Sequence, residues 1–506
     1  MRCGSVLVAL SLLAALQAFQ TALLEAPSAR LAVRSLRSQR SASLSMSLPV
    51  KPEKSSDFTY GLGSIAFSLL PLTPEAVGRR KTIFTEVVKD SVWTLDQVQG
   101  IINVNVPVRC TVIKLSTGLF VNNPVAPTPE CVRMVRQLEA LHGPVRYITL
   151  ASLALEHKGT AGVFSTYFPQ AKVYVQPGQY SFPLDLPTQL FFPLGRVGEI
   201  PESSKDAPWG EEIDHKILGV LRPPGPGGFA ETAFFHKASR TLLVTDTVVE
   251  VRDEPPEVIN EDPRALLYHA RDSMLEVVED GGEARRRGWR RMVLFGLTFQ
   301  PSGIEVKDTF EALKMLGQVA PEMRALGDGA VPFDGGFYPW EWVRDDKPNF
   351  RALQGGLLVA PILQKLILNR EPERVVAWVE EVCKWPFTRI IPAHLANDLK
   401  AGPGEFRAAF DFLYERPGTP RTPSTKTGTT TTTPTTSPSP SPSFLAPLEG
   451  LLALFSGGNK GTGKGGKGGG GKGARPLAED VAFLTDVSAQ LTKSGVLFPE
   501  APLLRR

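Results

Sequence analysis

The sequence predicts an α/β fold in which helices pack on sheets, and three observations lead to that prediction. Segments typical of strands and of helices alternate along residues 80–416. The strand-like segments carry β-branched and aromatic residues with partial alternation, as half-buried strands do. Apolar residues make up 42% of the chain, which is enough to form a core. Alternating strands and helices place helices over the faces of a sheet, so a layered domain is expected.

The first half of the predicted domain contains four strands and two helices. The strands are expected at 82–95, 102–115, 145–150 and 171–177, and the helices at 128–143 and 162–170. The first of these helices has clear end signals. Thr128 suits the N-cap, Pro129 suits the first helical position, and Gly143 suits the residue after the last turn.

The second half of the predicted domain continues the same alternation. Residues 231–251 predict a β-hairpin whose turn is Lys237–Arg240. The apolar run "MVLFGLTF" at 292–299 predicts another strand, and residues 360–384 are predicted to be helical. The segment "FTRIIPAHL" at 387–395 predicts the last strand, with a histidine where that strand ends.

The N-terminal residues have the pattern of targeting signals rather than of a folded domain. Residues 1–18 contain an apolar run, Val6–Leu16, followed by small residues, which is typical of a signal peptide. Residues 19–46 are rich in Ser, Ala and Arg with Glu25 as their only acid, which is typical of a transit peptide. A signal followed by a transit peptide that opens on Phe19 resembles the two-part presequence of algae with secondary plastids. The alternative is a secretory signal followed by a disordered pro-segment.

Three further segments complete the organisation. Residues 47–79 form a Pro-containing lead segment with weak periodicity. Residues 417–473 consist of a Thr/Ser/Pro-rich tract and a Gly/Lys-rich tract, which cannot form a core and are predicted to be a disordered insertion. Residues 476–506 return to an amphipathic pattern and predict a C-terminal helix that packs on the main domain.

Charge and cysteine content narrow the classes of function. The formal net charge of +4 is small for 506 residues and argues against a dedicated nucleic-acid-binding protein. The four cysteines contain no C-x-x-C pair, which argues against a disulfide framework or a cysteine-based zinc cluster. No segment after the signal reaches 18 consecutive apolar residues, so no transmembrane helix is predicted. The partner is then a small-molecule substrate or another protein.

Two motifs resemble binding sites, but we expect neither of them to be one. Gly458 and Gly463-Lys464 have the spacing of a phosphate-binding loop, but Gly465 stands where Ser or Thr would bind magnesium. The basic run Arg285–Arg291 surrounds an aromatic residue, an arrangement that can hold an anion or a stacked base. We expect it to be a solvated helix end ahead of the strand at 292–299.

Four polar residues at predicted strand ends form a candidate metal site. Glu156 and His157 come after one strand, Asp246 comes after "TLLV", and His394 comes after "RIIP". In layered α/β proteins ligands gather at strand ends along one edge. Two imidazoles and two carboxylates suit zinc, iron or manganese. His236 is excluded, because hairpin pairing places it about five strand residues, or roughly 16 Å, from Asp246.

Each of these residues has an ordinary structural alternative. A lone histidine at a strand end is more often a cap or a satisfied core group than a ligand. Asp246 can form an Asx turn, and Glu156 can pair with Lys158 or Arg146. The prediction therefore rests on the order and context of the set.

The order of these residues resembles the metallo-β-lactamase superfamily. The first motif of that superfamily is H-x-H-x-D-H, and the matching stretch here is 152–157, "SLALEH". Ser152 and Ala154 replace the two leading histidines, and Glu156 replaces the aspartate. The last histidine of the motif is present as His157.

Of the remaining superfamily ligands, some are present in this sequence and one is missing. The bridging aspartate matches Asp246 and the last histidine matches His394, while the region of the middle histidine reads "PPGPGGF" and contains none. The resemblance implies that one metal site is lost. It also implies that the other can be formed by His157, Asp246, His394 and Glu156.

Longer motifs resemble a more specific family, the plant, algal and cyanobacterial domain of unknown function 4336. The matching stretches include "KTIFTEVVKDSVWTLDQVQGI", "VYVQPGQYSFPLDLP", "AFFHKASRTLLVTD", "APILQKLILNR" and "WPFTRIIPAHL". The resemblance covers residues 80–416 and resumes in the C-terminal segment. It implies a metallo-β-lactamase-like, four-layer αββα sandwich and a plastid setting, but no established activity.

Two functions remain open from the sequence. The first is a plastid metal-dependent hydrolase in which one zinc, iron or manganese ion activates water for attack on an ester, thioester or similar bond. The second is a catalytically inactive relative that binds no metal and serves as a binding or scaffold module. The superfamily ligands that are retained support the first function. The superfamily ligands that are replaced or missing support the second.

Overall fold

The computed structural model describes residues 80–101, 103–179, 196–221, 228–327, 335–415, 474–495 and 497–505. The predicted signal peptide, transit peptide and lead segment lie outside these residues, as do the 417–473 insertion and both glycines of its phosphate-loop-like motif. All four residues of the candidate metal site lie within the described residues.

The larger sheet has seven strands in sequence order. Its first four strands are antiparallel, because hairpins join them, and from the fourth strand onward it is parallel. The strands are β1 (Ile83–Val88), β2 (Val92–Ile101), β3 (Val104–Leu115), β4 (Gly118–Asn122), β5 (Val145–Leu150), β6 (Lys172–Val175) and β7 (Val197–Glu199). The strands predicted at 102–115, 145–150 and 171–177 are confirmed as β3, β5 and β6, whereas the single strand predicted at 82–95 is wrong, because a turn at 89–91 divides it into β1 and β2.

The smaller sheet has four strands in the order β13-β10-β9-β8. They are β8 (Ile213–Leu221), β9 (Phe229–His236), β10 (Thr241–Val244) and β13 (Arg389–Pro392). The predicted hairpin is confirmed, since β9 and β10 pair with His236 opposite Thr241. The last strand, β13, lies parallel to β10, so the residues that follow these two strands leave the same edge of the sheet.

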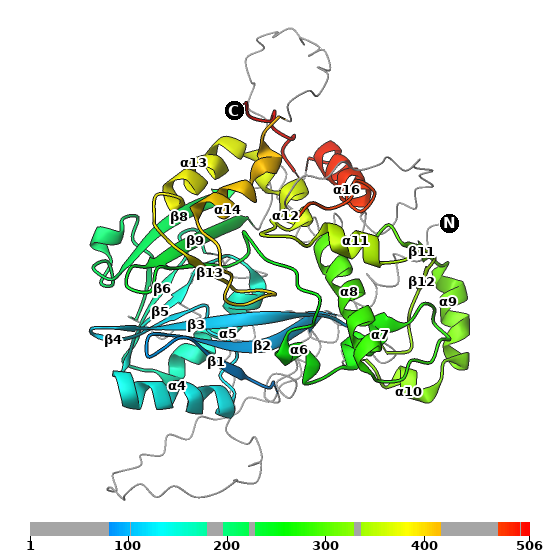
Figure 1. Cartoon of the computed structure of the whole chain (residues 1–506), viewed down its shortest axis with the longest axis horizontal. Coiled ribbons are helices and arrows are strands. Elements are labelled where there is room, and N and C mark those ends of the chain that lie inside the picture. Colours follow the sequence, from blue (N-terminus) through cyan, green and yellow to red (C-terminus); the bar gives the residue numbers. More distant parts are fainter. Residues whose placement is uncertain are drawn as a thin grey trace, which may run out of the picture.

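Helices cover the outer face of each sheet (Figure 1). The seven-stranded sheet packs against α4 (Pro129–His142) and α5 (Leu155–Tyr167), and the four-stranded sheet packs against α13 (Pro372–Val382) and α14 (Pro403–Ala408). A third apolar core, containing Phe120, Phe234 and Ile391, fills the space between the two sheets. These three cores separate four layers, so the predicted αββα sandwich is confirmed.

Helix α4 begins and ends where the sequence predicts. The Thr128 side chain accepts a hydrogen bond from the backbone N–H of Cys131 at 3.1 Å, as an N-cap residue does. Pro129 occupies the first turn, and Gly143 ends the helix with a φ of 93°, which favours glycine.

A helical lobe lies beside the sandwich, inserted between β10 and β13 (Figure 1). Its helices are α6 (Glu257–Asn260), α7 (Arg264–Ala270), α8 (Gly282–Thr298), α9 (Thr309–Met315), α10 (Pro321–Arg324) and α11 (Lys347–Ala352). A two-stranded ribbon, β11 (Ile304–Val306) with β12 (Trp340–Trp342), completes it. The lobe has its own apolar core, which includes Trp289 and Phe350.

The strand predicted at 292–299 is wrong, because these residues form the second half of α8. A short, mostly apolar run fits a buried helix as well as a strand. The predicted helix at 360–384 is confirmed as two helices, α12 (Pro361–Leu366) and α13, since Pro372 starts a new helix and cannot continue the old one.

The C-terminal segment contributes α16 (Ala482–Lys493), which contacts α12. Arg370 donates a hydrogen bond to the Ser488 hydroxyl at 2.6 Å, and Asn349 donates to Asp480 at 2.7 Å. Among the residues that the structure describes, none of the helices combines the length and apolar character needed to cross a membrane.

His269 gives the lobe a predicted sensitivity to acid. It is buried on α7, and its Nε2–H donates to the carbonyl oxygen of Asn103 at 3.1 Å. Burial lowers the pKa of His269 to about 3, whereas an unfolded histidine titrates near 6.5. The unfolded chain therefore binds more protons between these values. We expect His269 to contribute a fall of ~1.4 kcal/mol per pH unit in the free energy of unfolding as the pH falls below about 6.5.

This expectation is checked by urea denaturation at pH 7.5 and at pH 5.5. The His269→Gln variant can keep a donor but cannot take up a proton, so it should lose less stability than the wild type over this interval. Equal losses in the two proteins would show that His269 does not contribute to the acid sensitivity.

Candidate metal site

The four residues predicted as metal ligands lie together in the structure. One ligand atom from each of Glu156, His157, Asp246 and His394 lies within 4.8 Å of all the others. Glu156 and His157 come from α5, Asp246 comes from the turn after β10, and His394 comes from the loop after β13. Two of the side chains thus follow a strand of the seven-stranded sheet, and two follow strands of the four-stranded sheet.

The local structure of Glu156 and His157 differs from the expectation. The sequence predicts a helix only from residue 162, but α5 begins at Leu155 and both residues lie in its first turn. The start signal is weak because Ala154 is at the N-cap and has no capping side chain. The Ser152 hydroxyl instead accepts a hydrogen bond from the Ala154 N–H at 2.9 Å.

The distances between the donor atoms fit a single ion. His157 Nε2 and His394 Nε2 are 3.2 Å apart. Two nitrogens that each lie ~2.0–2.1 Å from one tetrahedral zinc ion would be separated by about 3.3 Å. Asp246 Oδ1 lies 2.9 Å from His394 Nε2 and 3.9 Å from His157 Nε2. Glu156 Oε1 is farther out, 4.0 Å from His394 Nε2.

The two histidines differ in their affinity for protons. Burial, together with the neighbouring His394, lowers the pKa of His157 to about 4, so His157 is neutral at pH 7. Burial also opposes protonation of His394, but its hydrogen bond with Asp246 and the nearby carboxylate charges outweigh burial and raise its pKa. His394 Nδ1 donates to the carbonyl oxygen of Pro107 at 2.9 Å, which directs Nε2 toward the other donors.

The two carboxyl groups also differ. Partial burial and the charge of Asp246 raise the pKa of Glu156, whose side chain is 32% exposed and is the most accessible of the four. Burial opposes ionisation of Asp246, but His394, His157 and the Ser152 hydroxyl outweigh it and lower the pKa of Asp246. The site therefore pairs an ionised Asp246 with a Glu156 that holds a proton more readily.

The residues at the lost ligand positions have other contacts. The Ser152 hydroxyl donates to Asp246 Oδ2 at 3.3 Å, and Ala154 has no side-chain donor. Most of the stretch where the middle histidine would lie, 223–229, is outside the described residues. His236 lies at the far end of β9, where its Nδ1 contacts the Ser239 hydroxyl at 2.7 Å, so its exclusion from the site is confirmed.

Sequence reasoning missed two buried charged residues that support the site. Arg109 on β3 forms a bidentate ion pair with Asp96 and donates to the backbone carbonyls of Pro392 and Leu395, on either side of His394. Glu231 on β9 lies beneath Asp246. A charged residue inside an apolar strand was the available signal for both, but their partners are far away in the sequence.

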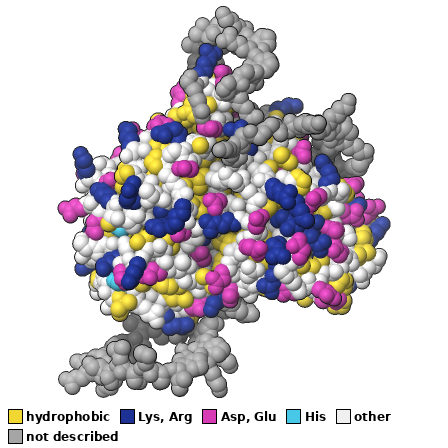
Figure 2. All heavy atoms as spheres, viewed as in Figure 1, with side chains coloured by type: hydrophobic (Ala, Val, Ile, Leu, Met, Phe, Trp, Pro, Cys, Tyr) yellow, Lys and Arg dark blue, Asp and Glu magenta, His cyan; other side chains and the backbone are white. Residues whose placement is uncertain are grey.

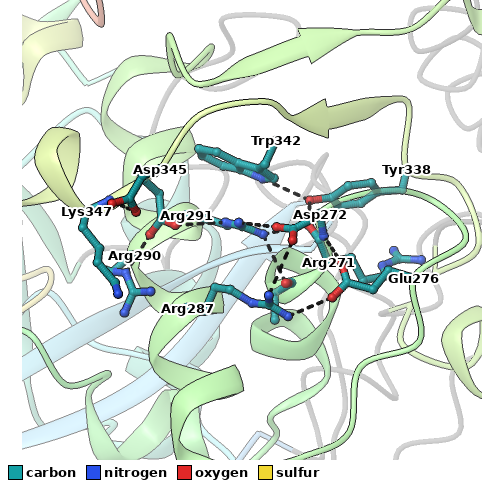
Figure 3. A network of polar contacts seen from close by, with 12 residues as sticks. Arg271, Asp272, Glu276, Arg287, Arg290, Arg291, Tyr338, Trp342, Asp345 and Lys347 are labelled. Atoms are coloured by element: carbon teal, nitrogen blue, oxygen red, sulfur yellow. Dashed lines mark hydrogen bonds and ion pairs between the residues drawn. The ribbon is translucent and has the colours of Figure 1, made fainter.

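The basic run Arg285–Arg291 forms a different polar network, in the helical lobe (Figure 3). Arg287 pairs with Glu276 at 3.1 Å, Arg290 pairs with Asp346 at 2.6 Å, and Arg291 pairs with Asp272 at 2.5 Å. The expectation of a solvated helix end is wrong, because the run lies inside α8 and part of it, including Arg291, is buried.

This network does not have the charge of an anion site. A groove of about 660 Å³ lies against it and is lined by bases and acids alike. Figure 2 shows basic and acidic side chains gathered side by side over the lobe. Arg287 and Arg291 face carboxylates between α7 and α8, and Arg290 faces Asp346 directly before α11. The network therefore connects α8 to these two segments.

Comparisons with known proteins agree with the sequence resemblance. A family model described as "Domain of unknown function (DUF4336)" matches residues 89–412. None of the curated proteins compared with the chain matches it.

Two solved structures are similar to parts of this chain. A metallo-β-lactamase from Hirschia baltica aligns with 11% identity and a TM-score of 0.25, over 34% of this chain and 73% of that one. The Flv1 flavodiiron core from Synechocystis sp. aligns with 9% identity and a TM-score of 0.33, over 66% of this chain and 60% of that one.

Proposed function

Because the chain belongs to the family described as "Domain of unknown function (DUF4336)", which has no activity in its description, we propose a function from the site itself. We propose a hydrolase that uses one metal ion, zinc or else iron or manganese, held by His157, Asp246 and His394. The observation that carries the proposal is the 3.2 Å separation of the two Nε2 atoms beside an ionised carboxylate. Three protein ligands leave one position of a tetrahedral ion open, as catalytic zinc sites do.

The proposed reaction is the hydrolysis of an ester, thioester or similar acyl bond. The ion would supply Lewis acidity that lowers the pKa of water toward ~7 and makes hydroxide available at neutral pH. Glu156, which is the most exposed of the four and has a raised pKa, is suited to take a proton from water and return it to the leaving group. Water is consumed, the acyl bond breaks, and a carboxylic acid and an alcohol or thiol are released.

Metal analysis of the protein, purified without added metal or a chelating tag, tests the ligand set. We expect about one ion per chain in the wild type and loss of that ion in His157→Ala and His394→Ala. His236→Ala is the matched control, because His236 also lies at a strand end but has its contacts elsewhere. It should retain the ion.

A panel of activated esters and acyl thioesters tests the reaction. We expect hydrolysis by the wild type that is lost in His394→Ala and strongly reduced in Glu156→Gln. Two results together would overturn the metal centre. The wild type would contain no metal, and the double variant His157→Ala with His394→Ala would be as stable as the wild type. A metal-loaded wild type that hydrolyses none of the panel would instead favour the inactive binding module, which the replacements at Ser152 and Ala154 support.

We also propose that the protein acts in a plastid, reached through the two-part presequence of residues 1–46. The order of an apolar signal and an acid-poor, Arg-containing segment supports this location. A fluorescent protein fused after residue 79 should accumulate in the plastid. Secretion of the fusion would contradict the proposal.

A further inference from the structure

Glu231 forms an unusually dense set of hydrogen bonds directly beneath the candidate metal site. It lies on β9 and is buried. Its Oε1 accepts from the Thr245 N–H at 2.8 Å and from the Thr247 hydroxyl at 2.8 Å. Its Oε2 accepts from the Asp246 N–H at 2.7 Å and from the Thr247 N–H at 3.0 Å. One carboxylate thus holds three consecutive residues.

These hydrogen bonds take the place of the strand-to-strand hydrogen bonds that end with β10. Strand β10 ends at Val244, so the N–H groups of the next three residues need other acceptors. Because Glu231 supplies them, the backbone that carries Asp246 is fixed at the residue itself and at both of its neighbours. Asn123 adds a further restraint by donating to the Thr245 hydroxyl at 3.0 Å.

The side chain of Asp246 is fixed in the same way. Its Oδ2 accepts from the Ser152 hydroxyl at 3.3 Å, and Ser152 also forms a backbone bridge with Glu231. Its Oδ1 is thereby left facing His394 Nε2 at 2.9 Å. Glu231 lies between the segment before α5 and the segment after β10, and each of these carries candidate ligands.

We propose that Glu231 is the positioning residue that directs the Asp246 carboxylate toward the two histidines. A buried carboxylate next to a second one is unfavourable unless strong donors surround it, so its presence here calls for a local reason. Holding three N–H groups of a ligand-bearing turn is such a reason. The consequence for metal affinity rests on the proposed function, whereas the fixing of Asp246 does not.

Glu231→Gln tests the proposal, because it keeps the size of the side chain but replaces one acceptor oxygen with an NH2 group that cannot accept. Thr232→Val is the matched control, since Thr232 is the next residue on β9, is also buried, and bonds to Gln176 instead of the site. In Glu231→Gln we expect a 10- to 100-fold loss of Co²⁺ and Zn²⁺ affinity, the usual range for a group that orients a ligand. The visible spectrum of bound Co²⁺ should change. Thr232→Val should keep both the affinity and the spectrum.

Amide hydrogen exchange of the metal-free proteins separates this proposal from the proposed function. Exchange at residues 245–247 should be faster in Glu231→Gln than in wild type and unchanged in Thr232→Val. Should Glu231→Gln fail to fold, Glu231→Asp provides the same measurements. A wild type that binds no ion would overturn the metal centre alone. Unchanged exchange at 245–247 would overturn the role of Glu231, as would unchanged affinity and spectrum in a wild type that binds Co²⁺.

Discussion

Replacing Arg109 with methionine is expected to lower the free energy of unfolding by about 3–5 kcal/mol, the range found when one partner of a buried ion pair is removed. The Arg109 side chain is 1% exposed, and that of its partner Asp96 is 11% exposed. Without Arg109, Asp96 remains as a buried carboxylate without its cation. The carbonyl oxygens of Pro392 and Leu395 also lose their donors, which lie 2.6 and 3.0 Å away in the wild type.

The same substitution should weaken the candidate metal site. Leu395 has a φ of 55°, a left-handed conformation that a leucine rarely adopts, and Arg109 bonds to its carbonyl oxygen. Loss of that bond frees the backbone next to His394. Metal affinity should therefore fall together with stability, although Arg109 is not itself a ligand.

Urea denaturation of the metal-free protein measures the stability effect. Arg407→Met is the control, because Arg407 and Glu380 form an ion pair whose side chains are 46% and 45% exposed, and such pairs contribute about 0.2–1 kcal/mol. Adding Asp96→Asn to Arg109→Met should restore part of the loss, since it removes the uncompensated charge. A change in Arg109→Met no larger than that in Arg407→Met would contradict the expectation.

Replacing Asp346 with alanine should have an effect of similar size, but confined to the helical lobe. The Asp346 side chain is 5% exposed and accepts from Arg290 Nε at 2.6 Å, with Arg291 Nε 3.5 Å away. Removing it leaves two arginines with less charge compensation in a buried place, and we expect a loss of about 3 kcal/mol.

Metal affinity separates the two substitutions. The network around Asp346 belongs to the lobe and includes none of the four candidate ligands, so Asp346→Ala should leave Co²⁺ affinity unchanged while amide exchange in α8 becomes faster (Figure 3). Asp345→Ala is a neighbouring control, because Asp345 is exposed and bonds to the backbone N–H of Lys347. Equal destabilisation by both variants would argue against the buried pairing as the cause.

Local signals predicted most of the sandwich. Thr128, Pro129 and Gly143 predicted the limits of α4, because capping depends on residues close in the sequence. In the helical lobe, local signals led to a wrong prediction. The apolar run at 292–299 was separated from the arginines before it, although together they form one helix with Trp289 and Met292 on its buried side. The helical period is visible only over the whole of residues 282–298.

The candidate site was predictable for a related reason. Glu156, His157, Asp246 and His394 each follow a predicted strand, and strand ends meet at the edge of a sheet. The residues that orient them were not predictable, because Arg109 bonds to carbonyls more than 280 positions away and Glu231 bonds to a turn on another strand. The sequence pattern identifies the candidate metal ligands. The residues that orient these ligands are identified only by their tertiary contacts.

The division of the four donors between the sheets has a consequence for stability. Glu156 and His157 follow a strand of the seven-stranded sheet, and Asp246 and His394 follow strands of the four-stranded sheet. An ion held by both pairs would be a cross-link between the two halves of the sandwich. Because only the folded chain brings the pairs together, each tenfold rise in free ion above the dissociation constant would add ~1.4 kcal/mol to the free energy of unfolding. The fraction of the chain that is folded would then depend on the concentration of the free ion.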